Sequence, residues 1–198
     1  RDLRSLDRFL DIVLHKRLYA AKFGMLNDPM EGIFTYHDDP NVRKFISELT
    51  REKAEMRICS LSKTHNNCLL WSYYADSHQG IALGVRVAAE KRGIIKLDRI
   101  DYSNSNHFEP FTGSQPDTEA IRVLSRKLES WRHEEEYRVF TKSSYIPVEI
   151  KVIYLGCRIS KAMGRLIREL MEKTYPEIQV LQMKTQDLDR EDIAFRIK

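Results

Sequence analysis

The chain has 198 residues, 42% hydrophobic and 31% charged, which predicts one soluble globular domain over residues 1–198 with a substantial core. No apolar run approaches the ~18 residues of a membrane span, and three cysteines without framework spacing favour a reducing compartment, so we expect a cytoplasmic protein with no membrane partner. The net charge of +4 arises from 33 basic and 29 acidic residues, a mixed surface that only mildly favours an anionic partner.

The first half of the chain predicts helices and strands separated by one stiff turn. Asp39-Pro40 is a capping residue followed by proline, so a helix is expected from there to about Glu55. Asn27, Asp28 and Pro29 exclude a helix and allow side-chain hydrogen bonds to nearby amides, which predicts a rigid turn. The other expected elements are helices over residues 3–16 and 66–75 and strands over residues 17–23, 57–62 and 81–87.

The second half adds more strands than helices. Its expected strands cover residues 94–102, 136–141, 148–155, 178–183 and 193–197, and its expected helices cover residues 117–131 and 160–173. A polar loop over residues 103–116 separates the first strand from the first helix. Because strands and helices do not alternate strictly, the pattern predicts an α+β domain with packed helices on one mixed, mostly antiparallel sheet. That sheet is expected to contain residues 57–62, 81–87, 94–102, 136–141 and 148–155.

The stretch W-R-H-E-E-E-Y-R, residues 131–138, carries the strongest candidate chemistry. On a strand, side chains alternate between faces, so Glu134, Glu136 and Arg138 share one side, while Tyr137 and Val139 face the core. Two carboxylates and a guanidinium therefore lie close together. Either they face a cleft as catalytic groups, or the arginine pairs with a glutamate at a strand end and only holds the sheet.

Other candidate site residues have a structural alternative. Ser60 and Ser62 place two hydroxyl groups on one face of a strand. Trp71 and Tyr74 lie on an aromatic-rich helix and either stack on a ligand ring or pack in the core. His78, at the following turn, either contacts a ligand or caps the helix end.

A metal site is not expected. Cys59, His65 and Cys68 include one short spacing, but a closed zinc site needs four ligands and the fourth is missing. The cysteines therefore fit packing positions better. No glycine-rich loop of the common phosphate-binding types is present either.

Several stretches in a fixed order resemble a large bacterial family defined as a domain of unknown function. They are L-N-D-P-M-E-G (26–32), I-C-S-L-S (58–62), L-W-S-Y-Y-A-D-S-H-Q-G-I-A-L-G (70–84), W-R-H-E-E-E-Y-R (131–138) and V-I-Y-L-G (152–156). The resemblance spans roughly residues 6–156. The chain departs from it at Leu61 and lacks the usual Tyr-Lys-Tyr-Arg opening, unless Arg1 is its last residue. The family name implies no activity.

A looser resemblance, to ADP-ribosyltransferases of the arginine–serine–glutamate type, does imply one. Arg1 or Arg4, then Ser60-x-Ser62, then Glu134-x-Glu136 follow the order of that family. A proline-containing turn and a hydrophobic strand over residues 145–154 follow the catalytic strand in the same way. The resemblance implies NAD as co-substrate, with no metal.

The same resemblance assigns roles to individual residues. Glu136 would stabilise positive charge on the ribose, and Glu134 would orient or deprotonate the acceptor. Ser60 and Ser62 would brace the glutamate, and Arg1 would hold the pyrophosphate. Trp71 or Tyr74 would stack on nicotinamide, and His78 is a further candidate for cofactor contact.

The competing interpretation is a module without catalytic activity. Mild basicity and aromatic side chains are also typical of a nucleic-acid-binding or protein-interaction domain in a bacterial stress or phage-defence system. The partner expected under either interpretation is a nucleic acid or a protein, as acceptor or as ligand. Carboxylates pointing into a concave site would favour the enzyme, whereas a flat basic face with exposed aromatic residues would favour the binding module.

Overall fold

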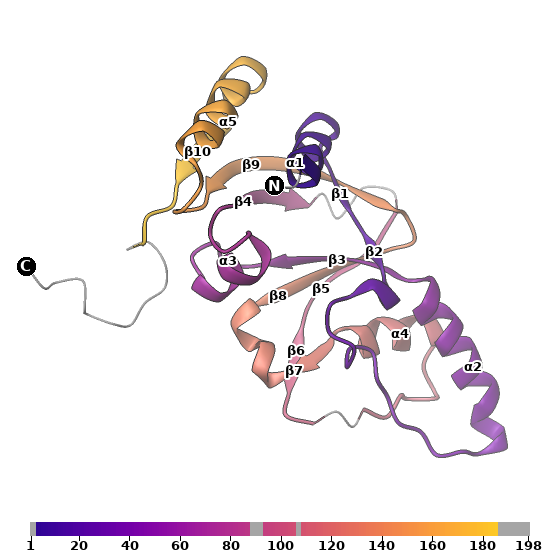
Figure 1. The fold of residues 1–198 in the computed structure, drawn as a ribbon. Helices are drawn as coiled ribbons and strands as arrows, with labels where there is room; N and C mark the ends of the chain where they lie inside the picture. The colour runs from indigo at the N-terminus through magenta and orange to yellow at the C-terminus, as the bar shows by residue number, and fades with distance from the viewer. Residues whose placement is uncertain (1–2, 88–92, 106–107, 186–198) are drawn as a thin grey trace, which may run out of the picture. The chain divides into compact units, whose positions relative to one another are not determined.

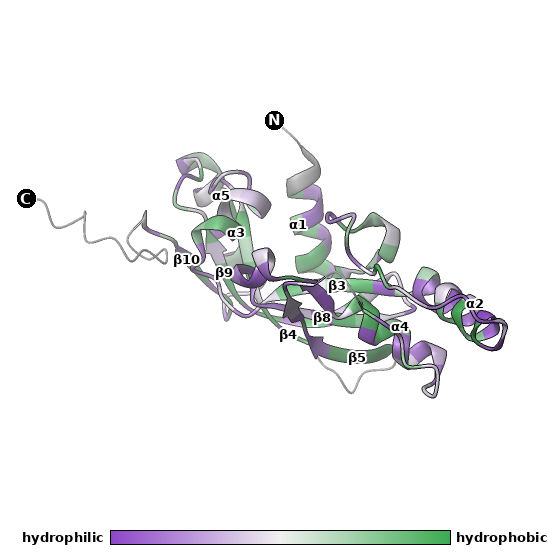
Figure 2. Cartoon of the chain, turned by 90° about the horizontal axis from the view of Figure 1, so that it is seen from below, coloured by the Kyte–Doolittle hydropathy of each residue, from purple (hydrophilic) through white to green (hydrophobic). Residues whose placement is uncertain are grey.

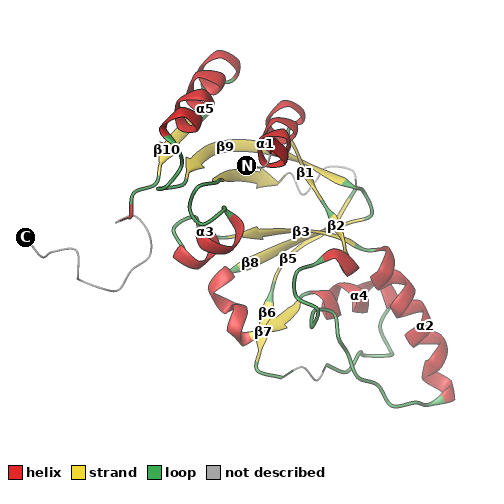
Figure 3. Ribbon diagram, viewed as in Figure 1, coloured by secondary structure: helices red, strands yellow, loops and turns green. Residues whose placement is uncertain are grey.

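A computed structural model describes residues 3–87, 93–105 and 108–185 of the chain. The chain divides into two compact units, each assembled from segments distant in sequence. Unit 1 comprises residues 1–16, 64–88 and 148–198, and unit 2 comprises residues 17–63 and 89–147. Both units combine helices with mostly antiparallel strands (Figure 1, Figure 3), which confirms the α+β class. The assignment of the whole chain to one domain stays a prediction.

The sheet of unit 1 is built around β9 (Tyr145–Leu155), whose residues 148–155 belong to this unit. Strand β4 (Ile81–Val87) pairs with it antiparallel, and β10 (Gln179–Gln182) pairs with it parallel. All three strands follow the apolar runs expected from the sequence.

The helices of unit 1 cover both faces of this sheet. Helices α1 (Leu3–His15) and α5 (Lys161–Thr174) pack on one face, and α3 (Cys68–Tyr74) lies on the other (Figure 1). Ser160 caps α5 by accepting a hydrogen bond from the Met163 amide at 3.2 Å. The core beneath α1 and α5 contains Phe9, Val13, Ile150, Ile153, Leu155, Ile167, Met171 and Ile178.

Unit 2 contains a four-stranded antiparallel sheet in the order β2-β3-β8-β5. Its strands are β2 (Ala21–Lys22), β3 (Arg57–Ser62), β8 (Glu136–Thr141) and β5 (Ile94–Arg99). Strands β3 and β8 have the bounds predicted from the sequence. Strand β8 lies between β3 and β5, so its side chains are surrounded on both edges.

Two helices cover this sheet. Helix α2 (Pro40–Glu55) begins where expected, because the Asp39 carboxylate accepts a hydrogen bond from the Asn41 amide at 2.8 Å. It alternates hydrophilic and hydrophobic residues (Figure 2) and packs against α4 (Pro116–Leu124). The remaining elements of unit 2 are β1 (Arg17–Tyr19), η1 (Phe23–Met25), β6 (Asp101–Ser103), β7 (Arg126–Leu128) and η2 (Glu129–Glu134), where η marks a 3₁₀ helix.

The described helices are short and charged. The longest, α2, has 16 residues and carries lysine, arginine and glutamate along its length. Within the described ranges, no helix has the length and apolar character needed to cross a membrane. A cytoplasmic location stays a prediction.

The prediction of a single five-stranded sheet was wrong. Strands β4 and β9 pair with each other, whereas β3, β5 and β8 belong to a separate sheet. Strands β8 and β9 are linked by only residues 142–144, yet they do not pair as a hairpin. Alternating apolar residues predict which segments are extended, but pairing partners depend on contacts between residues far apart in the chain.

Two predicted elements were also too long. The strand expected over residues 94–102 is interrupted at Ile100, whose amide donates to the Glu136 carbonyl at 3.0 Å, and β6 then pairs in parallel with β7. The helix expected over residues 117–131 ends at Leu124 because the following residues form β7 and η2. Residues 126–128 pair through their backbone with β6, and this pairing outweighs the helical spacing of the apolar residues. The strand expected at 193–197 lies outside the described residues.

Candidate functional site

The candidate site begins with the pairing of β3 and β8. Ser62 lies opposite Glu136, and Ser60 lies opposite Arg138, so all four share one face of the sheet. The Ser60 hydroxyl donates a hydrogen bond to the Glu136 carboxylate. Phe140 follows on the same face and packs against α4, and Glu136 and Arg138 are buried there, whereas Ser60 and Ser62 are exposed.

Arg138 is the most deeply buried charged group of the site, with a side chain only 1% exposed. Its Nε lies 2.7 Å from Oε1 of Glu136, and its Nη2 lies 3.2 Å from Oε2 of the same carboxylate. Nη2 also lies 2.5 Å from Oε2 of Glu31, and Nη1 donates to the Leu124 carbonyl at 2.7 Å. Arg138 therefore ties β8 to the loop of Glu31 and to the end of α4.

Lys127 of β7 forms the second cationic centre, and its side chain is 6% exposed. Its Nζ lies 2.5 Å from Glu134, 3.1 Å from Glu136 and 3.5 Å from Glu31. The ammonium group also lies 4.8 Å from the centre of the Trp131 ring. Glu31, Lys127, Glu134, Glu136 and Arg138 together form one buried network, referred to below as the ion cluster.

The ion cluster corrects two expectations for the central stretch. Glu134 does not lie on the strand with Glu136 but ends η2, and Glu135 between them adopts a left-handed φ of 42°. The two carboxylates still meet, because both bind Lys127. They point into the ion cluster rather than into a cleft, and Arg138 pairs with Glu136 as the structural alternative proposed.

The two carboxylates bound to Arg138 have pKa values that move in opposite directions. Burial raises the pKa of Glu31, and the charges of Arg138 and Lys127 offset this only in part. Burial also acts to raise the pKa of Glu136, but hydrogen bonds and charge from Arg138, with Lys127 and Ser60, bring it below its usual value. Glu31 is therefore the carboxylate that takes up a proton more readily, and Glu136 stays ionised.

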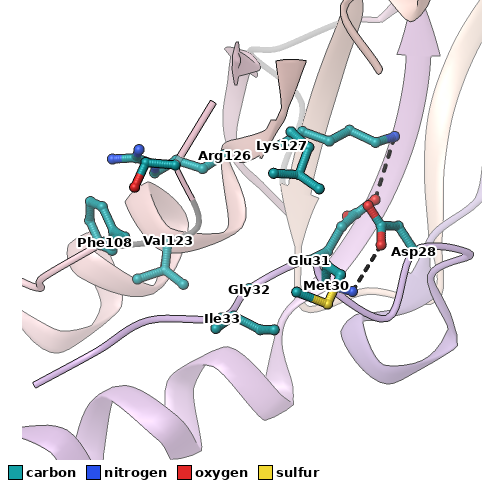
Figure 4. A pocket seen from close by; sticks show the side chains of 11 residues that line it. Asp28, Met30, Glu31, Gly32, Ile33, Phe108, Val123, Arg126 and Lys127 are labelled. Carbon is teal, nitrogen blue, oxygen red and sulfur yellow. Dashed lines mark hydrogen bonds and ion pairs between the residues drawn. The ribbon is translucent and has the colours of Figure 1, made fainter. Parts of the chain in front are cut away.

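A small hollow of about 30 Å³, open to solvent, lies beside the ion cluster (Figure 4). It is lined by residues 28, 30–33, 105, 108, 123 and 126–128, all of which belong to unit 2. Glu31 and Lys127 are the members of the ion cluster that line it. Glu31 is thus the carboxylate of the cluster placed at the surface of the hollow.

The loop that carries Glu31 is held rigidly. The Asp28 carboxylate accepts a hydrogen bond from the Met30 amide at 2.9 Å, and the Asp28 carbonyl accepts one from the Glu31 amide at 3.2 Å. Gly32 has a φ of +69°, and a Cβ there would lie 2.6 Å from the Phe23 ring, so only glycine fits. The stiff turn expected at residues 27–29 is present and aims Glu31 at the ion cluster.

Replacing Asp28 with alanine is expected to destabilise the protein by about 1 kcal/mol, because the turn loses the hydrogen bond to the Met30 amide. Asp28→Asn keeps a side-chain oxygen acceptor at the same place and is the matched control. Urea denaturation of the three proteins at one pH measures the difference. Equal stability of the alanine variant and wild type would show that this turn does not depend on Asp28.

No family model, curated protein or solved structure matches the chain. Both resemblances therefore rest on the motifs of the sequence alone. The chemistry of the site follows from its own side chains.

The other candidate residues from the sequence lie in unit 1 or outside the described residues. Trp71 is buried in the core of unit 1, and its Nε1 donates to the His65 carbonyl at 2.6 Å. Tyr74 is exposed, and Nε2 of His78 lies 3.0 Å from Oγ of Ser72. Trp71 and His78 are brought together, since the His78 amide donates to the Trp71 carbonyl at 3.1 Å.

The side chains of the two candidate arginines are outside the part of the chain that the structure describes. Arg1 lies outside the described residues, and the backbone of Arg4 belongs to α1, the helix expected over residues 3–16. The resemblance therefore leaves the arginine position without a described residue.

The cysteines show no metal-binding arrangement. Burial raises the pKa of the Cys59 thiol to about 12, as expected for a packing position. His65 stacks on Tyr154 with ring centres 4.3 Å apart, and Cys68 Sγ lies 3.9 Å from Nε2 of His78. Across the described ranges, no group of three histidine, cysteine or acidic side chains is placed to hold a metal ion.

Two members of the ion cluster, Glu31 and Lys127, were not predicted from the sequence. Glu31 stands in L-N-D-P-M-E-G, so the motif that supplied the turn also contained the carboxylate. Lys127 had no such signal, because it fell within an expected helix where a lysine is usually solvated. The burial of both residues depends on contacts with β8, far away in sequence.

The opposite pKa shifts of Glu31 and Glu136 predict opposite pH dependences of stability. The folded-state pKa of Glu31 lies above its usual 4.5, so its contribution is full below that pH and is lost as pH rises through the folded-state value. The stability of wild type relative to Glu31→Gln should therefore decrease as pH rises above about 4.5.

The contribution of Glu136 to stability depends on pH in the opposite direction. Its folded-state pKa is lowered from 4.5, so its contribution is present above that pH and is lost as pH falls through the folded-state value. The stability of wild type relative to Glu136→Gln should therefore increase as pH rises towards about 4.5. Urea denaturation at several pH values measures both differences. Two differences that change with pH in the same direction would contradict this assignment.

Proposed function

We propose that the chain is an NAD-consuming enzyme of the ADP-ribosyltransferase type, with its reacting carboxylates in unit 2. The observation that carries this proposal is the pair Glu31 and Glu136, which share Arg138 and have pKa values moved apart. Neighbouring carboxylates with separated pKa values are suited to two tasks, one moving a proton and the other remaining ionised.

The charge of the ion cluster fits the reaction. Three carboxylates (Glu31, Glu134 and Glu136) face two cations (Lys127 and Arg138), which leaves one negative charge in excess when all are ionised. When the bond between nicotinamide and ribose breaks, its electron pair leaves with the nicotinamide nitrogen, and positive charge develops on the ribose. A preorganised negative site stabilises this charge in the transition state.

The roles of the carboxylates follow from their positions. Glu136 lies behind the surface of the hollow and acts through its charge. Glu31 lines the hollow and accepts the proton of the acceptor as the acceptor's lone pair forms the new bond to the ribose carbon. The resemblance gave this second role to Glu134, but Glu134 does not line the hollow.

The serines support the same proposal. The resemblance implies that Ser60 and Ser62 brace the reactive glutamate, and here Ser60 donates to the Glu136 carboxylate while Ser62 lies opposite Glu136 on β3. A hydroxyl donor helps to keep that carboxylate ionised.

Release of nicotinamide tests the proposal. Purified protein is incubated with NAD, nicotinamide is measured by chromatography, and NAD binding is measured by calorimetry. We expect both binding and nicotinamide release, with transfer of ADP-ribose to a nucleic acid or protein acceptor or to water. A folded protein that neither binds NAD nor releases nicotinamide would reject the enzyme. The ion cluster would then be a structural core within a nucleic-acid-binding or protein-interaction module.

A further inference from the structure

Arg126 is a positioned cation at one end of the hollow. It lies on β7 directly before Lys127, and both residues line the hollow. The centre of its guanidinium lies 4.7 Å from the centre of the buried Phe108 ring. This stacking fixes the direction of a side chain that would otherwise be flexible.

Arg126 differs from the other cations of this region in its partners. Lys127 contacts three carboxylates, Arg138 contacts two, and Arg122 lies 3.5 Å from Glu119. In the part of the chain that the structure describes, the side chain of Arg126 makes no ion pair or hydrogen bond, and it contacts the Phe108 ring. A guanidinium that lines a hollow without a counter-ion is suited to bind an anionic group of a ligand.

The hollow has two electrically different ends. Figure 4 shows Arg126 and Phe108 at one end and Asp28 and Glu31, near Lys127, at the other. A ligand that fits both ends carries negative charge on one part and positive charge or hydrogen-bond donors on another.

We infer that Arg126 binds a phosphate group of the ligand, with the rest of the ligand directed towards Glu31. Phosphate accepts paired hydrogen bonds from a guanidinium, and a ribose offers hydroxyl donors to a carboxylate. The identification of the phosphate as the pyrophosphate of a dinucleotide rests on the proposed function. Arg126 then takes the role that the sequence gave to Arg1.

Calorimetry with inorganic phosphate, inorganic pyrophosphate and ADP-ribose tests this inference on the full chain. Arg126→Met removes the charge but keeps an unbranched side chain on Phe108. We expect it to weaken binding of ADP-ribose by at least ~10-fold, the effect of losing a charge-assisted hydrogen bond. Arg126→Lys should recover part of this affinity. Pyrophosphate binding should fall in parallel, and binding of phosphate alone would identify a simple anion site.

Arg122→Met is the matched control. Arg122 lies 4.6 Å from the same Phe108 ring but does not line the hollow, so its loss should change affinity less than ~2-fold. Thermal unfolding of each variant checks that it is folded. Unchanged affinity in Arg126→Met, or no binding of any of the three ligands by wild type, would overturn the inference.

The experiments distinguish binding of an anion by Arg126 from cleavage of NAD. If ADP-ribose binds through Arg126 but NAD is not cleaved, the anion site stands and the proposed reaction fails. If NAD is cleaved and Arg126→Met leaves KM unchanged, the reaction stands and Arg126 has no part in binding.

Discussion

Replacing Arg138 with methionine is expected to lower the free energy of unfolding by about 3–5 kcal/mol. The substitution keeps an unbranched side chain but removes the partner of two buried carboxylates, Glu31 and Glu136, and of the Leu124 carbonyl. Those groups stay out of water without a counter-charge, and this loss exceeds any gain from methionine packing. Urea denaturation followed by circular dichroism measures the change.

Arg43→Met is the matched control for Arg138→Met. Arg43 pairs with Asp38 at 2.9 Å, but their side chains are 63% and 69% exposed, so its loss should cost no more than about 1 kcal/mol. Arg138→Lys keeps a charge without the paired geometry and should lie between wild type and the methionine variant. It also provides a measurable protein if the methionine variant does not fold. Similar stability of the Arg138 and Arg43 variants would show that the buried network contributes nothing specific.

Glu136→Gln is expected to reduce nicotinamide release from NAD by at least ~100-fold, the scale of losing one preorganised electrostatic contact. Glutamine keeps the shape but not the charge of a group held ionised by Arg138, Lys127 and Ser60. Under the interpretation in which Glu136 faces a cleft, the substitution would have little effect on folding. The buried pairing now predicts a loss of stability larger than the ~1 kcal/mol of an exposed pair.

Glu135→Gln is the control that tests whether removing any negative charge near Glu136 reduces activity. Glu135 is the exposed neighbour of Glu136 and takes no part in the ion cluster, so both activity and stability should stay near wild type. Rates are measured at saturating NAD, at a temperature where circular dichroism shows each variant to be folded. A folded Glu136→Gln protein with full activity would leave Glu136 a structural role only.

The parts of the fold that depend on neighbouring residues were predictable. Asp39-Pro40 begins α2 through a cap that lies within three residues, and β3 and β8 follow from alternation along six residues each. The turn at Asp28 follows from the same kind of local hydrogen bond. Such signals are present in any short window of the sequence.

The parts that depend on distant residues were not predictable. Nothing near Lys127 indicates that it is buried against Glu31 and Glu136, or that its segment pairs with β6 instead of extending α4. The sequence around Arg138 does not indicate that this residue is buried, because its burial comes from α4 and the loop of Glu31. The same order of charged residues in the sequence is compatible with a solvent-exposed strand end and with a buried network of ion pairs.

Because each of the two units contains one tryptophan, the unfolding of each unit can be followed by its own intrinsic fluorescence. Of its two tryptophans, Trp71 belongs to unit 1 and Trp131 to unit 2. Trp71→Phe and Trp131→Phe would therefore each leave one intrinsic fluorophore, emitting from one unit alone. Coincident loss of the two emission signals in denaturant would mean that the units unfold as one cooperative body, and separate midpoints would mean that each is a domain in its own right.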